Sequence, residues 1–211
     1  MLRSGSRTAG ADALDGRKSA AGTLPGGRRG DGMEPNPLIE TFEQWKRADY
    51  SFCPKCGGAL GRRSVKVSEP DRLVCRACGF IFFLDPKVAV GTIVSLEGGI
   101  LLIRRAIEPA YGKWVFPGGF VDRGESVEQA AVRETREESH VDVRISRLLN
   151  IYSYPDHPVI IIVYVAEAVG GEPKAGDETL EAGTFEPHSI PWEDLAFPST
   201  AQALRDYLKE R

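Results

Sequence analysis

Residues 118–141, GGFVDRGESVEQAAVRETREESHV, carry the strongest structural signal in the chain. Three acidic residues within them, Glu134, Glu137 and Glu138, follow an i, i+3, i+4 spacing, which places their side chains on one face of a helix. Like charges at this spacing repel, and each pair costs about 0.2–0.5 kcal/mol in an isolated helix. The clustering therefore indicates that a cation or a substrate offsets the repulsion.

The ends of this helix can be predicted from its capping residues. Ser126 is a suitable N-cap, and Gln129 three residues later completes the pattern of a capping box. The helix is then expected to run to about Ser139. Its apolar stripe consists of Val127, Ala130 and Ala131. These side chains are small enough for the helix to lie close against a sheet.

Neighbouring residues favour a metal ion as the partner of the acids. Gly118 and Gly119 let the backbone approach an ion or a phosphate closely, and Arg133 can pair with Glu125 or with one of the clustered acids. Mg²⁺ is held by one or two protein carboxylates together with water and substrate phosphates. A solvated helix face is the alternative, but the combination of features predicts a Mg²⁺ or Mn²⁺ site.

The same stretch resembles the signature of the Nudix hydrolases, G-x5-E-x7-R-E-U-x-E-E-x-G-U, in which U is a bulky aliphatic residue. Every charged position is present, and the matching residues are Gly119, Glu125, Arg133, Glu134, Glu137, Glu138 and Val141. Two positions depart from the signature, since Thr135 replaces the aliphatic residue and His140 replaces the glycine. We expect that glycine to end the helix in a left-handed conformation, which costs histidine about 1 kcal/mol.

The resemblance implies both a fold and a chemistry. It implies a Nudix-type α/β/α sandwich with a mixed sheet over residues 85–211, and hydrolysis of a diphosphate bond in a nucleoside-diphosphate-X substrate. Glu125 and Arg133 would form a supporting salt bridge. The ligands of Mg²⁺ or Mn²⁺ would be Glu134, Glu137, Glu138 and the carbonyl of Gly118.

The resemblance also implies a proton acceptor and a substrate surface. The acceptor is either Glu138 or an acid of the later AGDETLEAGTF segment, where Glu181 ranks ahead of Asp177 and Glu178. Aromatic rings near the site could stack on a base, although core packing is the alternative for each of them. The aromatic candidates are Tyr111, Trp114, Phe116, Tyr152 and Tyr154. The residues that we place at the substrate are Gly118, Gly119, Phe116 and Tyr152.

Four cysteines form two C-x2-C pairs, each followed by glycine, in CPKCGG and CRACGF. Two such turns can aim four thiolates at one ion, and a tetrahedral set of four sulfurs suits zinc. Redox-active pairs and two disulfides are the alternatives, but the spacing is typical of a structural zinc ribbon. Thiolates kept for a metal indicate a reducing compartment, so we expect a cytoplasmic protein. The ligands are Cys53, Cys56, Cys75 and Cys78.

The remaining elements are predicted from period and turn chemistry. Residues 88–106 contain two strands joined by a hairpin at Glu97, Gly98 and Gly99. A short strand ends at Pro117, and further strands are expected over residues 144–154 and 159–168 and in TLEAGTFEP. Ser199 or Thr200 is expected to cap a last helix, whose buried side consists of Leu204, Tyr207 and Leu208.

Composition limits the class of protein. The net charge of −3 and a hydrophobic content of 42% fit a folded body without broad charge-driven binding of nucleic acid. No apolar run reaches the roughly 18 residues of a membrane span. Residues 1–32 have no hydrophobic period, and we expect a disordered extension there, either an organelle transit peptide or a segment ahead of a true start at Met33. We assign 33–50 to a linker with helical character and 51–84 to the ribbon.

Two groups of Nudix enzymes resemble a ribbon followed by this signature. The NADH pyrophosphatases carry a Ser-Gln-Pro-Trp stretch beyond the signature, and this sequence lacks it. FCPKCGG and IPWEDLAFPSTAQALRDYL look closer to the FAD and ADP-ribose pyrophosphatases. We therefore expect cleavage of FAD, ADP-ribose or a related ADP-containing compound to AMP, with an NADH, NAD⁺ or NAD-cap substrate as the alternative. Resemblance to the family also implies a homodimer.

A nucleic-acid-binding regulator with a ligand-sensing Nudix domain is the rival from another class. Such a protein is expected to lose some of the clustered acids, and here none is missing. Modest contact with RNA remains an alternative because the ribbon segment is basic. Its charged residues are Lys55, Arg62, Arg63, Lys66, Arg72 and Arg76 against Glu69 and Asp71.

Overall fold

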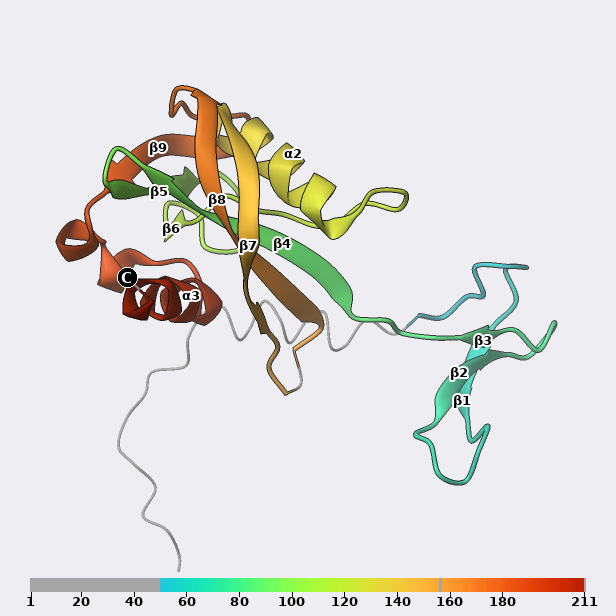
Figure 1. Cartoon of the computed structure of the whole chain (residues 1–211). Helices are drawn as coiled ribbons and strands as arrows, with labels where there is room; N and C mark the ends of the chain where they lie inside the picture. The colour runs from blue at the N-terminus through green and yellow to red at the C-terminus, as the bar shows by residue number, and fades with distance from the viewer. Residues whose placement is uncertain (1–49, 156, 211) are drawn as a thin grey trace, which may run out of the picture. The chain divides into compact units, whose positions relative to one another are not determined.

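The structure is a computed structural model, and it describes residues 50–155 and 157–210 of the 211-residue chain. The predictions made for residues 1–32 and for the segment up to residue 49 lie outside the described residues. The described residues form two sheets, one of three strands and one of six, and each is described by itself (Figure 1). None of the helices in the described ranges is long and apolar enough to cross a membrane.

The three-stranded sheet carries the four cysteines. Its strands are β1 (Leu60–Arg63), β2 (Arg72–Cys75) and β3 (Ile81–Phe82), all antiparallel with β2 in the centre. The sheet is too small to bury many side chains, and Leu73 and Val74 of β2 are its buried apolar residues apart from cysteines. Such a small core indicates that this unit depends on its cysteine cluster for stability.

The six-stranded sheet is mixed, as predicted. The order is β6-β5-β4-β8-β7, with β9 also paired to β5. Among the pairings of these strands, β4 with β8 is the parallel one, and the others are antiparallel. The bounds are β4 (Lys87–Leu96), β5 (Gly99–Arg105), β6 (Trp114–Val115), β7 (Val141–Tyr152), β8 (Val159–Gly171) and β9 (Thr179–Phe185).

The predicted hairpin between β4 and β5 is confirmed. Leu96 pairs with Gly99, so Glu97 and Gly98 form a two-residue loop. Both have positive φ, 50° for Glu97 and 85° for Gly98, as a type I′ turn requires. Strands β7 and β8 differ from the predicted bounds, because β7 begins at Val141 rather than at residue 144 and β8 continues to Gly171 rather than ending at residue 168.

Helix α2 (Val127–Ser139) has the predicted bounds and capping box. Ser126 Oγ accepts from the Gln129 N–H at 3.2 Å, and Gln129 Oε1 accepts from the Ser126 N–H at 2.8 Å. His140 ends the helix at φ 58°, so the left-handed C-cap predicted from the missing glycine is present. Ala130 and Ala131 are fully buried and let α2 lie against the sheet.

Helix α3 (Pro198–Lys209) packs on the other side of the sheet from α2 (Figure 1). Alternating residues of the strands serve the two sides: Ile93 belongs to the core cluster with Leu204 and Tyr207 of α3, whereas Val94 belongs to a separate cluster with Val141. This alternation follows from the period of two in a strand. Two 3-10 helices, Pro187–Ser189 and Trp192–Asp194, precede α3.

The predicted cap of α3 is wrong. Phe197 occupies the N-cap position without a side-chain hydrogen bond, and Pro198 is the first helical residue. Ser199 and Thr200 therefore lie inside the first turn. Proline is favoured at this position because its missing N–H has no partner there in any case and its φ is already helical. The predicted buried side of α3 is correct, since Leu204 and Tyr207 are buried and Leu208 packs against the same cluster.

Candidate active site

The Gly118–Gly119 loop is pressed against strand β4. The Val90 N–H donates to the Gly119 carbonyl at 2.8 Å, and the Thr92 N–H donates to the Pro117 carbonyl at 2.9 Å. A Cβ at Gly118 would lie 2.2 Å from the Val90 carbonyl oxygen, so a side chain at this position would push the loop off the strand. The glycine pair therefore allows a close backbone approach, but its closest neighbour in the structure is β4.

Glu138 is the most buried acid of the cluster. It is 8% exposed, and its Oε2 accepts a hydrogen bond of 2.7 Å from the Gly118 N–H. Burial raises the pKa of Glu138 to about 8, and the neighbouring charges of Glu134 and Glu178 act in the same direction. The Gly118 N–H and the positive charge of Arg105 oppose this rise. A positive charge placed next to Glu138 would therefore favour its ionised form.

Arg133 ties the acids together. Its Nε and Nη2 donate to the two oxygens of Glu125, at 3.1 and 2.7 Å. Its Nη1 donates to Glu134 Oε1 at 2.7 Å and to Glu137 Oε2 at 3.0 Å, and Nη2 also reaches the Phe120 carbonyl. The guanidinium lowers the pKa of Glu125 to about 2. The pairing of Glu125 with Arg133 that we predicted is present as a bidentate contact.

The oxygens that Arg133 leaves free are suited to Mg²⁺ or Mn²⁺. Each of Glu134 and Glu137 has one carboxylate oxygen outside the Arg133 contacts, and hard oxygen donors are the ligands these ions prefer. A Cβ at Gly119 would lie 2.5 Å from the Glu134 carboxylate, so a side chain there would displace that acid from its present position. Within the described residues, however, the group of acids and cysteines gathered within 4.8 Å is the cysteine cluster. The three glutamates are neighbours without being that closely gathered.

Thr135 connects the acidic helix to the sheet. Its Oγ1 lies 2.6 Å from Thr92 Oγ1 and donates to the Ala131 carbonyl at 2.7 Å. Both threonines are fully buried. Since the single hydroxyl proton of Thr135 is used on Ala131, the Thr92 hydroxyl must be the donor between the two side chains. The threonine that departs from the family signature thus exchanges apolar packing for a buried hydrogen bond between α2 and β4.

A cavity of about 420 Å³ opens beside the glycine loop. Its walls are mainly apolar and come from β4, β6, β8 and the first turn of α3, with Val90, Val115, Phe116 and Ile161 among the lining residues. Gly118 and Gly119 line the cavity as well. The acids and the cavity therefore share the same loop, as expected when a charged and an apolar part of one ligand are bound side by side.

Arg105 is a site residue that the sequence analysis missed. It lines the cavity from the end of β5, its Nε donates to the Pro109 carbonyl at 2.9 Å, and its guanidinium lies 5.2 Å from the centre of the Phe197 ring. Burial lowers the pKa of Arg105, whereas Glu138 and Glu178 raise it. The sequence signal that could have identified Arg105 is the pair of arginines in LLIRRA, at the end of an apolar strand.

Two predicted residues lie away from this loop. Glu181 is on β9, and its exposed carboxylate is 3.9 Å from Arg104, whereas Glu178 is the acid of that segment whose charge affects Glu138. Tyr152 is buried in the core and donates to Asp206 at 3.0 Å. Of the aromatic candidates, Phe116 and Tyr154 line the cavity. Trp114 is buried in the core and Tyr111 is exposed.

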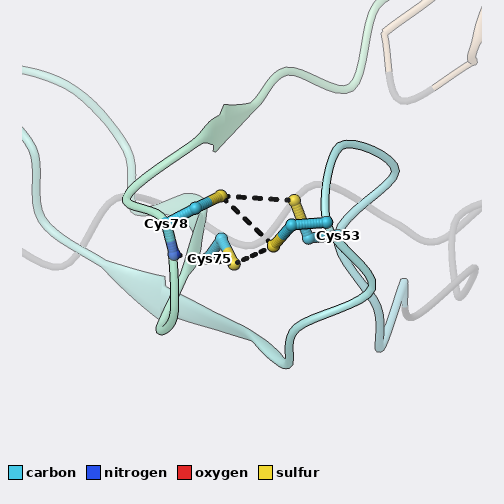
Figure 2. A group of neighbouring side chains, drawn as sticks. Cys53, Cys75 and Cys78 are labelled. Atoms are coloured by element: carbon cyan, nitrogen blue, oxygen red, sulfur yellow. Dashed lines mark hydrogen bonds between the residues drawn. The ribbon is translucent and has the colours of Figure 1, made fainter.

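The four cysteines form a compact sulfur cluster. The Sγ atoms of Cys56 and Cys78 are 3.3 Å apart, those of Cys56 and Cys75 are 3.5 Å apart, and those of Cys53 and Cys78 are 3.9 Å apart. Figure 2 shows three of these side chains converging. Four sulfurs about 2.3 Å from one zinc ion would be about 3.8 Å from each other. All four are free thiols, so the disulfide alternative does not apply.

The turns that hold the cysteines depend on glycine. Gly57 and Gly79 follow the two C-x2-C pairs at φ 74° and 71°. Their N–H groups donate to the carbonyls of Cys53 and Cys75, at 2.8 and 3.1 Å. A side chain at a positive φ is strained, so the glycine after each C-x2-C pair indicates a turn that needs a positive φ at that position.

Comparison with known proteins assigns the family. Residues 85–209 match the model of the NUDIX domain, which is more than half of the chain. The chain belongs to the Nudix family. Residues 51–83 match a second model, described as Nudix N-terminal, whose name denotes a zinc ribbon. The chain is therefore a Nudix hydrolase preceded by a zinc ribbon that carries four clustered cysteines.

Among relatives, an ADP-ribose pyrophosphatase of Methanocaldococcus jannaschii is 41% identical over 60% of this chain and 76% of that protein. An NAD-capped RNA hydrolase, NudC, of Stutzerimonas stutzeri is 30% identical over 77% of this chain and 56% of that protein. The chain thus spans little more than half of the length of the second relative. Among solved structures, a NUDIX hydrolase from Nitrosomonas europaea is 36% identical, with a TM-score of 0.74 over 77% of this chain and 92% of that one.

Proposed function

We propose that this Nudix hydrolase cleaves the diphosphate bond of an ADP-containing compound, ADP-ribose or FAD, and releases AMP. The observation that carries the proposal is the shared loop: Gly118 and Gly119 border both the buried acid Glu138 and the apolar cavity. A diphosphate next to the acids would leave an attached ring or sugar at the cavity. The relative named ADP-ribose pyrophosphatase, at 41% identity, supports ADP-ribose among these compounds.

The proposed metal ligands are the free oxygens of Glu134, Glu137 and Glu138 and the carbonyl of Gly118, and the proposed ion is Mg²⁺ or Mn²⁺. Such an ion, when bound, neutralises diphosphate charge and lowers the pKa of a coordinated water. Arg133 and Glu125 position Glu134 and Glu137 by the contacts described above.

The chain's own residues supply a proton acceptor and a cation. Glu138 is our first candidate for the acceptor. Glu178 replaces Glu181 as the second candidate because the charge of Glu178 contributes to the raised pKa of Glu138. Glu138 must be ionised to accept a proton, and nearby positive charge favours that form against its raised pKa. Arg105 provides part of that charge. Its Nη groups are also suited to a substrate phosphate oxygen.

Glu138→Gln tests the proposal. The variant is expected to lose at least about a hundredfold in turnover, because a ligand or a general base is removed while the hydrogen-bond acceptor for the Gly118 N–H is kept. The assay follows AMP from ADP-ribose, FAD, NADH, NAD⁺ and a diadenosine polyphosphate with Mg²⁺ and with Mn²⁺. Glu128→Gln is the matched control, since Glu128 is on the same helix and its carboxylate accepts from the Tyr164 hydroxyl, away from the acidic cluster. A fully active Glu138→Gln variant would refute the assignment.

NAD-capped RNA or NADH is the second candidate substrate. It is favoured by the match to NudC, which covers 77% of this chain, and by the basic residues of the ribbon. Filter binding of RNA at increasing salt separates the candidates, because binding through phosphates falls steeply on a log–log plot. A flat dependence removes the RNA substrate and the nucleic-acid-binding regulator together.

The ribbon is proposed to bind one structural Zn²⁺ through all four cysteines, which leaves no open position for catalysis. Four free thiolates of this kind favour a reducing compartment such as the cytoplasm. We also propose a homodimer, and sedimentation equilibrium of the zinc-loaded chain is the measurement that decides it.

A further inference from the structure

Helix α3 begins at the wall of the cavity with several polar groups unused. Phe197 offers no side-chain cap, and Pro198 has no N–H. The N–H groups of Thr200 and Ala201 both turn back to the Phe197 carbonyl. The N–H of Ser199, in contrast, makes no hydrogen bond within the described residues. Pro198, Ser199 and Thr200 all line the cavity.

Thr200 provides an independent sign that a ligand group is missing from this wall. Thr200 is fully buried, and its Oγ1 has no hydrogen-bond partner in the described part of the chain. Ser199 is also a buried residue of this wall, but its hydroxyl is not among the buried atoms that lack a partner. Buried hydroxyls without partners are rare in folded proteins because they lose water without compensation. The Thr200 hydroxyl and the Ser199 N–H at one cavity therefore indicate a site for a polar edge of a ligand.

The rest of the wall restricts the chemistry of that ligand. Val90, Val115, Phe116 and Ile161 present apolar surface, which suits the faces of a flat ring. Polar side chains also line the cavity, namely Arg105, Glu108, Tyr154 and His157. A ribose or a phosphate could contact these groups but would leave the apolar wall unused, and ribose 5-phosphate is therefore a probe in the test below. A heteroaromatic ring with nitrogen acceptors along one edge fits both the apolar faces and the unused donors.

We propose that the first turn of α3 reads the edge of an adenine ring held in the cavity, with the Ser199 N–H and the hydroxyls of Ser199 and Thr200 as donors to ring nitrogens. The adenine is that of the ADP-containing substrate, so the inference rests on the proposed function. It makes the sequence FPST at 197–200 a determinant of base specificity. It also places the sugar or flavin of the second half outside the cavity.

Binding of adenosine tests the inference without hydrolysis. The zinc-loaded full chain is titrated with adenosine, and with ribose 5-phosphate as the non-aromatic probe, by calorimetry with no added Mg²⁺ or Mn²⁺. Thr200→Val keeps the shape and removes the hydroxyl, and it is expected to weaken adenosine binding about three- to tenfold, as the loss of one hydrogen bond does. Ser199→Ala should weaken it to a similar degree. Ribose 5-phosphate should not respond to either change.

Thr179→Val is the matched control. Thr179 Oγ1 is also buried without a partner, but Thr179 starts β9 and does not line the cavity. Both valine variants remove an unpartnered hydroxyl, so both should fold, and the unfolding midpoint confirms this. Equal affinity of the Thr200→Val and Thr179→Val variants for adenosine would overturn the inference. Preferential binding of ribose 5-phosphate over adenosine would overturn it as well.

Deaza analogues identify the ring nitrogen that is read. Adenosines lacking N1, N3 or N7 are titrated into the wild type and into the Thr200→Val variant. One of them should bind the wild type about as weakly as adenosine binds the variant, and should lose nothing further in the variant. Additive losses for all three would contradict a contact with Thr200.

If ADP-ribose and FAD are not hydrolysed but this pattern holds, the proposed function fails and the base site stands. If they are hydrolysed and the pattern is absent, the base site fails and the proposed function stands.

Discussion

Replacing Thr135 by valine removes the acceptor of the Thr92 hydroxyl while keeping the shape of the side chain. Thr92 then has a buried hydroxyl with no acceptor, which costs about 1–3 kcal/mol. The methyl group that valine adds returns up to about 0.8 kcal/mol of apolar burial. We therefore expect a net loss of about 1–2 kcal/mol in the free energy of unfolding. For a chain of this size, this corresponds to about 2–8 °C in the unfolding temperature.

The same exchange at the partner residue, Thr92→Val, is expected to change the free energy of unfolding much less. This difference between the two variants is what tests the hydrogen-bond direction. In Thr92→Val the Thr135 hydroxyl still donates to the Ala131 carbonyl, so the change should stay within about 0.5 kcal/mol. The double variant has two apolar side chains facing each other and should recover most of the loss. The measurement is urea unfolding of the three zinc-loaded variants, followed by tryptophan fluorescence. Equal losses for Thr92→Val and Thr135→Val would refute the donor and acceptor assignment.

Three other outcomes are expected. His140→Gly should raise the free energy of unfolding by about 0.5–1 kcal/mol in thermal melts, because His140 sits at φ 58°; a loss would mean that the imidazole has a stabilising contact. The folded pKa of Glu125, about 2, is below its ordinary value of 4.5, so its stabilising effect is complete above pH 4.5 and is lost as the pH falls towards 2. The difference in free energy of unfolding between the wild type and Glu125→Gln should therefore shrink over this pH range. A constant difference in acid unfolding curves would contradict the pairing with Arg133. Chelation should release the four ribbon thiols to a thiol reagent while the circular dichroism of the Nudix domain persists; thiols that stay protected without zinc would argue against the metal.

Local signals explain why the acidic helix and the cysteine turns could be predicted. The capping box of α2 and the CG pairs of the ribbon each depend on residues a few positions apart, and the structure has them as the sequence indicated. The left-handed His140 was predictable for the same reason, since one missing glycine marked the end of the helix. The mixed sheet followed from family resemblance rather than from any local pattern.

The rest of the site depends on contacts between distant segments. Arg105 gains its place from packing on Phe197 and from the nearby Glu138, and no spacing rule connects these positions. Glu178 precedes β9 and its charge acts on Glu138, whereas Glu181 lies on β9 near Arg104. Three acids so close in sequence give no local signal of this difference. At α3 the sequence offered Ser199 and Thr200 as caps, but proline at the first helical position shifted the start of the helix and turned both residues towards the cavity wall.

The parallel pairing of β4 with β8 has a consequence for synthesis of the chain. Lys87 lies opposite Val159, and the register continues to Ser95 opposite Glu167, so the whole of helix α2 is translated between the two partners. While the ribosome is still making that helix, β4 has no neighbour on this side, and its exposed backbone edge is open to other chains. Contacts this distant in sequence form late and slow folding. Nascent chains stopped before β8 should therefore engage chaperones far more than chains stopped after Gly171.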